Sequence, residues 1–196
     1  MIRLALPMTL ALVLISSAAV ADRGFAGRKG WNLQLNDDTT NSIVEQLKRD
    51  FRTCQNKPKV YRYDCYRRSY RTGAQELNGS REYGPVAEAL ALVEKRIGAA
   101  VQANLDPSQP PLRDNIFIQH RAVKPEALPL IKQATLAAME EATTILLRTP
   151  DNEQQKHFQR VAAVIQSNKV LLRSALLALP RPMIRLAQMF APSLHG

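Results

Sequence analysis

The sequence predicts an all-α protein, an antiparallel helical bundle of about five helices in which a disulfide clamps one helical hairpin. Five segments carry apolar residues at three- and four-residue steps, the period of an amphipathic helix. Beyond the N-terminal segment no run alternates as a strand does, and the best candidate, residues 115–118, is too short to found a sheet. Because each apolar stripe must be buried against another, the five segments favour a bundle.

The first 21 of the 196 residues have the three parts of a secretory signal peptide. Arg3 supplies the positive charge, an apolar run extends over residues 4–15, and Ala19-Val20-Ala21 provides small residues before a cleavage site. The apolar run is shorter than the roughly 20 residues that cross a bilayer. We therefore expect cleavage between Ala21 and Asp22, which leaves a periplasmic or secreted chain without a transmembrane helix.

The mature chain is predicted to begin with a flexible basic arm and two helices. The arm, residues 22–39, is glycine-rich and has no apolar period. A first helix then begins near Thr40, with Thr40 or Asn41 as its cap, and a second runs from Pro58 to Leu77. The inward stripes are predicted to be Ile43, Val44, Leu47, Phe51 and Cys54 in the first helix, and Tyr63, Tyr66, Tyr70, Ala74 and Leu77 in the second.

Cys54 and Cys65 are the two cysteines of the chain. In an oxidising compartment such a pair forms a disulfide, and the spacing fits neither a Cys-x-x-Cys redox motif nor a haem-attachment site. We expect the bond to close the hairpin of the first two helices and to add roughly 3 kcal/mol of stability in the chain-entropy picture. A reactive or metal-binding pair is the alternative.

Three further helices follow, separated by proline-bearing breaks. The third begins at Gly84-Pro85, the fourth covers residues 125–148, and the fifth starts after a cap at Asp151 and reaches Leu179. Between the third and fourth lies a connector, residues 106–124, which is long for a compact domain and is either functional or draped over the surface. The inward stripe of the third helix is Val86, Leu90, Val93, Ile97 and Val101. That of the fourth is Leu128, Ile131, Thr135, Ala138, Ala142 and Ile145. That of the fifth is Phe158, Val161, Ile165, Leu172, Ala175 and Leu179, with Asn168 as a polar interruption.

The bundle domain is thus expected over residues 40–179, followed by a short amphipathic tail, residues 180–196. The tail carries Met183, Leu186 and Phe190 on one side. These side chains can pack back onto the bundle or onto a second subunit, and an interfacial membrane helix is the other possibility.

The basic residues are concentrated in the predicted helical hairpin. Residues 48–71 contain nine Lys or Arg and two acidic residues, Asp50 and Asp64, in a chain with a formal net charge of +10. Such a cluster attracts anions at a distance and raises the rate of encounter. The candidate binding residues are Lys48, Arg49, Arg52, Lys57, Lys59, Arg62, Arg67, Arg68 and Arg71.

Tyrosines interleave with these basic residues, a combination that can bind nucleic acid through base stacking and phosphate contacts. Here the tyrosines have the spacing of a core stripe, and the expected export takes the chain away from nucleic acid. We therefore expect a non-enzymatic binding or assembly protein of the bacterial cell envelope, with an acidic envelope protein or an anionic polymer or lipid surface as its partner. A basic face that only maintains solubility is the alternative.

No local motif points to an enzyme, a metal site or a cofactor. The chain lacks His-x-x-x-His, Glu-x-x-His, Gly-x-Ser-x-Gly and glycine-rich phosphate-binding patterns. The rival interpretation is a small exported enzyme acting on envelope glycans, assembled from Glu153, His157, Asp114 and His120. Glu153 and His157 share a helix face, where an exposed ion pair is the simpler expectation.

Overall fold

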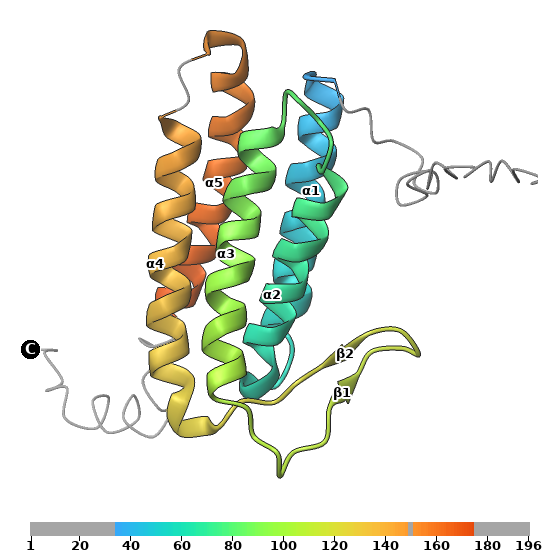
Figure 1. The fold of residues 1–196 in the computed structure, drawn as a ribbon, viewed down its shortest axis with the longest axis vertical. Helices are drawn as coiled ribbons and strands as arrows, with labels where there is room; N and C mark the ends of the chain where they lie inside the picture. Colours follow the sequence, from blue (N-terminus) through green and yellow to red (C-terminus); the bar gives the residue numbers. More distant parts are fainter. Residues whose placement is uncertain (1–33, 149–150, 175–196) are drawn as a thin grey trace, which may run out of the picture.

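The computed structural model describes residues 34–148 and 151–174 (Figure 1). Five α-helices make up most of this part of the chain: α1 (Asp37–Gln55), α2 (Lys59–Glu76), α3 (Gly84–Ala103), α4 (Leu128–Leu147) and α5 (Asn152–Ser174). The predicted signal peptide and its cleavage site, most of the arm, residues 175–179 of the fifth helix and the tail of residues 180–196 lie outside the described residues.

The helices form an antiparallel bundle, as predicted. Each one packs against the next along the chain in the opposite direction, and α5 comes to lie beside α1 and parallel to it (Figure 1). The order around the bundle therefore follows the order in the sequence, which is what short connections between helices favour. Within the described residues no helix is long and apolar enough to cross a membrane.

The first helix begins earlier than the sequence predicted. Its cap is Asn36, whose side chain accepts a hydrogen bond from the Thr39 amide at 2.8 Å. The two acidic residues of the first turn lie at the positive end of the helix dipole. Thr40, one of the predicted caps, lies inside the helix and is buried, so the last residues of the predicted arm belong to α1.

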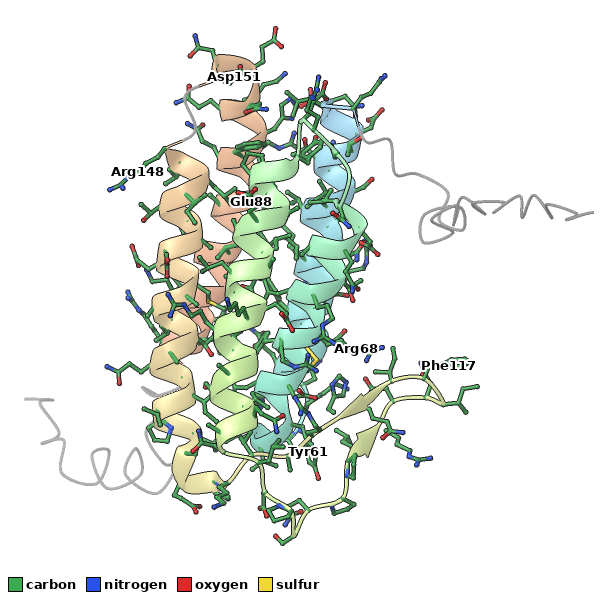
Figure 2. The ribbon with its side chains drawn as sticks, in the orientation of Figure 1. Tyr61, Arg68, Glu88, Phe117, Arg148 and Asp151 are labelled. Atoms are coloured by element: carbon green, nitrogen blue, oxygen red, sulfur yellow. A yellow bond between two sulfur atoms is a disulfide. The ribbon has the colours of Figure 1, made fainter. Side chains whose placement is uncertain are left out.

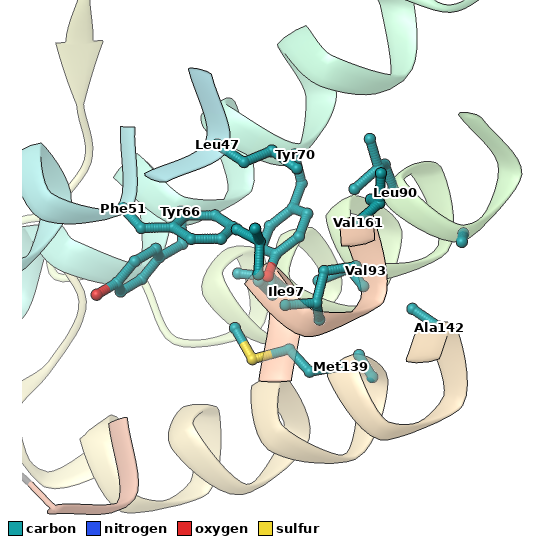
Figure 3. Close-up of a cluster of buried hydrophobic side chains, with 14 of the residues drawn as sticks. Leu47, Phe51, Tyr66, Tyr70, Leu90, Val93, Ile97, Met139, Ala142 and Val161 are labelled. Atoms are coloured by element: carbon teal, nitrogen blue, oxygen red, sulfur yellow. The ribbon is translucent and has the colours of Figure 1, made fainter. Parts of the chain in front are cut away.

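The predicted apolar stripes form one continuous core. Most of their described members are buried, and only Ala74, Leu128 and Ile145 are partly exposed. An aromatic group stands at its centre, where the ring centre of Phe51 lies 6.0 Å from that of Tyr66 and 5.2 Å from that of Tyr70 (Figure 3). The stripes of α3, α4 and α5 close over this group, in which each aromatic ring contributes a large apolar area.

Two details of the interior follow from small or polar residues. A Cβ on Gly73 would lie 3.1 Å from a methyl group of Leu90, so the glycine lets α2 and α3 approach closely. Asn168 interrupts the stripe of α5 and is nevertheless 1% exposed, beside the hydroxyl of Tyr70. The Tyr70 hydroxyl stays neutral because burial raises its pKa far above the ordinary value.

The connector between α3 and α4 carries the only strands of the described residues. β1 (Leu112–Arg113) and β2 (Gln119–His120) pair antiparallel, and a short 3-10 helix, η1 (Pro125–Ala127), leads into α4. The run at residues 115–118 had been the best strand candidate, yet it forms the loop that joins the two strands. The resulting β-hairpin extends sideways from the lower end of the bundle in Figure 1, beside α2.

Candidate functional site: a basic face beside the β-hairpin

The disulfide joins the first two helices as predicted. Cys54 lies in the last turns of α1 and Cys65 in the second turn of α2, with their Cα atoms 5.5 Å apart. This separation is in the usual range for a disulfide. The bond holds the closed end of the α1–α2 hairpin.

The nine predicted basic residues point in several directions. Arg67 and Arg71 face α3, where the carboxylate of Glu94 lies 3.3 Å from Arg67 and 2.8 Å from Arg71. Arg67 also donates to Asp64 at 2.8 Å, and its side chain is only 12% exposed. These two arginines therefore hold α2 against α3.

Asp64 is the buried acceptor of this arrangement. Besides Arg67, it accepts from the backbone amide of Arg121 at 2.9 Å and from the Arg121 guanidinium at 3.1 Å. Burial would raise the pKa of Asp64, but these hydrogen bonds and the charge of Arg67 hold it below the ordinary value. Asp64 thus ties the connector to α2 as a carboxylate.

Lys57 links the turn between α1 and α2 to the β-hairpin, and Arg62 holds that turn. Lys57 forms an ion pair with Asp114 at 2.6 Å, and the same carboxylate lies 3.0 Å from Nε2 of His120. Arg62 donates to the backbone carbonyl of Lys57 at 2.7 Å. Burial raises the pKa of Asp114, but hydrogen bonds from Lys57 and His120 outweigh it and lower the pKa.

Lys48 and Arg52 lie on the other side of α1. They border a groove of about 530 Å³ between α1 and α5, together with Arg160. Lys48 is paired with Glu45 at 2.9 Å, one helical turn away. Lys59 is exposed at the start of α2, and no ion pair within the described chain holds it.

Arg49 and Arg68 come together on the side of the bundle that faces the β-hairpin. They line a cavity of about 280 Å³, here called the hairpin cavity. Its other lining residues include three hydroxyl residues of the two helices and the Asp114–His120 pair; the full set is Gln46, Arg49, Asp50, Thr53, Cys65, Arg68, Ser69, Thr72, Asp114, Ile118 and His120. Among residues 34–148 and 151–174, no carboxylate lies within ion-pair distance of Arg49 or Arg68. Figure 2 shows Arg68 beside the disulfide.

The tip of the β-hairpin adds a feature that the sequence analysis missed. Ile116 and Phe117 are 81% and 80% exposed, more than any other large hydrophobic residue that the structure describes. Phe117 stands at the far end of the hairpin and points away from the bundle (Figure 2). The available signal is an apolar pair inside a polar, proline-bearing connector, where the sequence pattern predicts only a short strand candidate.

The four residues of the rival enzyme do not meet. Asp114 and His120 lie together at the β-hairpin, whereas Glu153 and His157 belong to the first turns of α5, at the opposite end of the bundle (Figure 1). The expected exposed ion pair between Glu153 and His157 is also wrong. His157 is buried, with Nδ1 2.6 Å from the Thr40 hydroxyl and 3.8 Å from Asp37.

Comparison with protein-family models, with curated proteins and with solved structures finds no match for this chain.

Proposed function

We propose that this chain is an exported, non-enzymatic binding protein of the bacterial cell envelope, and that the face formed by α1, α2 and the β-hairpin binds an anionic partner. The observation that carries the proposal is the hairpin cavity, which Arg49 and Arg68 enter without an ion pair among the described residues. A guanidinium group that no carboxylate neutralises keeps its long-range attraction for an anion and its hydrogen-bond donors.

Export is supported by two independent features. The N-terminal 21 residues have the pattern of a cleavable signal peptide. The Cys54–Cys65 disulfide is of the kind that forms in the periplasm or outside the cell.

The test is binding of the full chain to immobilised polyglutamate, a defined anionic polymer. The variant R49E/R68E reverses both charges in the hairpin cavity, where neither arginine has an ion pair to lose within residues 34–148 and 151–174. We expect its affinity to fall at least about tenfold, and its dependence on salt to become weaker, because two charge contacts are lost.

A matched control lies on the other side of α1. The variant K48E/R52E changes the net charge by the same amount, but in the α1–α5 groove. We expect it to bind polyglutamate within about threefold of the original protein, because long-range charge alone contributes little at physiological salt. Equal losses in the two variants would show that binding follows net charge and would overturn the proposed face.

A further inference from the structure

We propose that the tip of the β-hairpin inserts into the interface of an anionic lipid bilayer, with Ile116 and Phe117 among the lipids and Arg49, Arg68 and Arg113 at the headgroups. This inference rests on the proposed function and names the class of its partner. It depends on three properties of the same face: an exposed apolar tip, a rigid loop and a basic surrounding.

The apolar tip stands out from the rest of the molecule. After Ile116 and Phe117, the next most exposed large hydrophobic residue of the described chain is Val170, at 62%. Single exposed apolar residues are ordinary on protein surfaces, but two adjacent ones at the end of a projecting hairpin form a convex apolar point. A fluid bilayer interface accepts such a point without a shaped pocket.

The loop that carries the tip is fixed before any partner arrives. The side chain of Asn115 accepts hydrogen bonds from the amides of Phe117 and Ile118, both at 2.9 Å. The Asp114 amide donates to the Ile118 carbonyl at 3.0 Å and closes the loop. Insertion therefore requires little additional ordering of the backbone, which removes one of the main costs of binding.

The base of the hairpin is held to the helices as well. Lys57 pairs with Asp114 at 2.6 Å, and the Tyr61 hydroxyl donates to the Pro110 carbonyl at 2.8 Å. The β-hairpin therefore projects from the bundle in a fixed direction. Figure 2 shows Phe117 farther from the bundle than Arg68, so that the apolar tip would reach the bilayer first.

The positive charges near the β-hairpin favour binding to an anionic surface. Arg49 and Arg68 lack ion pairs among the described residues, and Arg113 is exposed in β1, next to the tip. Asp114 is already paired with Lys57 and His120, and Asp50 has an interaction of its own. Near an anionic membrane each basic side chain adds about fivefold in affinity, so the three arginines and the apolar tip together give measurable binding.

The first experiment measures co-sedimentation of the mature protein, residues 22–196, with vesicles made of equal parts phosphatidylglycerol and phosphatidylcholine. We expect I116S/F117S to weaken binding at least about tenfold, because two apolar side chains no longer leave water. The control L147S/V170S removes two other exposed apolar residues and should bind as the original protein does. Pure phosphatidylcholine vesicles should bind much more weakly. All four substituted side chains are exposed, so the circular dichroism melting curves should coincide.

The second experiment reports insertion directly. The chain has one tryptophan, Trp31, so the variant W31F/F117W carries a single fluorophore at the tip. We expect its emission maximum to shift to shorter wavelength when phosphatidylglycerol vesicles are added. A water-soluble quencher should then reduce the tryptophan emission less than it does without vesicles. An unshifted emission, or unchanged vesicle binding by I116S/F117S, would overturn the membrane inference.

The two proposals can fail separately. If the vesicle results are negative while R49E/R68E still loses polyglutamate binding, the tip is not a lipid element and the basic face remains the binding site. If I116S/F117S loses binding to polyglutamate while its vesicle binding is unchanged, the tip contacts the polymer, which also overturns the membrane inference. If R49E/R68E and K48E/R52E lose polyglutamate binding equally, and the original protein does not bind the vesicles, both the proposed function and the inference are refuted.

Discussion

Arg67 and Arg68 are neighbours in the sequence, yet they belong to two different regions of the molecule. Arg67 faces α3 and meets two carboxylates, those of Asp64 and Glu94. Arg68 faces the β-hairpin, and no ion pair within the described chain holds it. A basic cluster in a sequence can therefore contain two classes of residue, those that hold the fold together and those that remain available to a ligand.

Helix geometry explains the difference. Successive residues of an α-helix are turned by about 100°, so Arg67 and Arg68 cannot face the same neighbour. On the α3 side, a Cβ on Gly98 would lie 3.3 Å from the stem of Arg67, and the glycine leaves room for that side chain between the helices. On the other side the neighbour is the β-hairpin, whose carboxylate Asp114 is already paired with Lys57.

The largest effect is expected from the α3 side of the comparison. The substitution D64N leaves the guanidinium groups of Arg67 and Arg121 without their buried carboxylate. We expect the free energy of unfolding in urea to fall by about 3 kcal/mol, the loss typical of a broken buried ion pair. If the free energy of unfolding falls by less than about 1 kcal/mol, the usual value of a surface ion pair, Arg67 contributes no more to the fold than an exposed arginine does.

The disulfide holds the two helices that carry both regions. The double substitution C54S/C65S opens a loop whose ends are 11 residues apart in sequence. We expect the free energy of unfolding to fall by roughly 3 kcal/mol, because the unfolded chain gains conformational freedom. Urea denaturation of the oxidised original protein and of the variant measures the difference, and dithiothreitol should lower the stability of the original protein only.

The pH dependence should separate stability from binding. Burial, together with the positive charges of Lys156 and Arg160, lowers the pKa of His157 below its ordinary value of 6.5. The folded state therefore favours neutral His157, and this contribution is complete above pH 6.5 and is lost as the pH falls through the lower pKa of the folded state.

We accordingly expect the melting temperature to fall between pH 7 and pH 5. The variant H157Q should show a smaller fall, since its side chain does not titrate. The arginines remain charged over this range, so polyglutamate binding by the protein that is still folded should be preserved. A melting temperature that falls equally in both proteins would assign the effect to other groups.

The smallest change in the free energy of unfolding is expected on the hairpin side. The substitution E94Q removes the charge that Arg67 and Arg71 share and should cost about 1 kcal/mol of stability. The substitution R68Q should change stability by less than about 0.5 kcal/mol, since it breaks no ion pair in the part of the chain that the structure describes. Urea denaturation of the two single variants measures this difference, and a larger cost for R68Q would assign Arg68 to the fold.

The helices, their inward faces and the disulfide could be predicted from the residue pattern. Stripes such as Val86, Leu90, Val93 and Ile97 repeat at the helical period, and all four residues are fully buried. These features are local, because they depend on the spacing of residues along one helix or on a short loop between two cysteines. The start of α1 was placed too late, because the sequence predicted Thr40 or Asn41 as the cap. In the structure Asn36 caps the helix, and Thr40 is buried against His157.

Which basic residues remain available to a ligand depends on how the helices and the connector pack together. The spacing of Arg67, Arg68 and Arg71 indicates helix faces, but it does not reveal that Glu94 lies on the neighbouring helix or that the connector returns to α2. Likewise, the exposure of Ile116 and Phe117 follows from the way Asn115 closes a loop away from the bundle. Ion pairing and exposure depend on which segments lie next to each other in the folded protein. For residues far apart in the chain, the local sequence pattern does not predict these contacts.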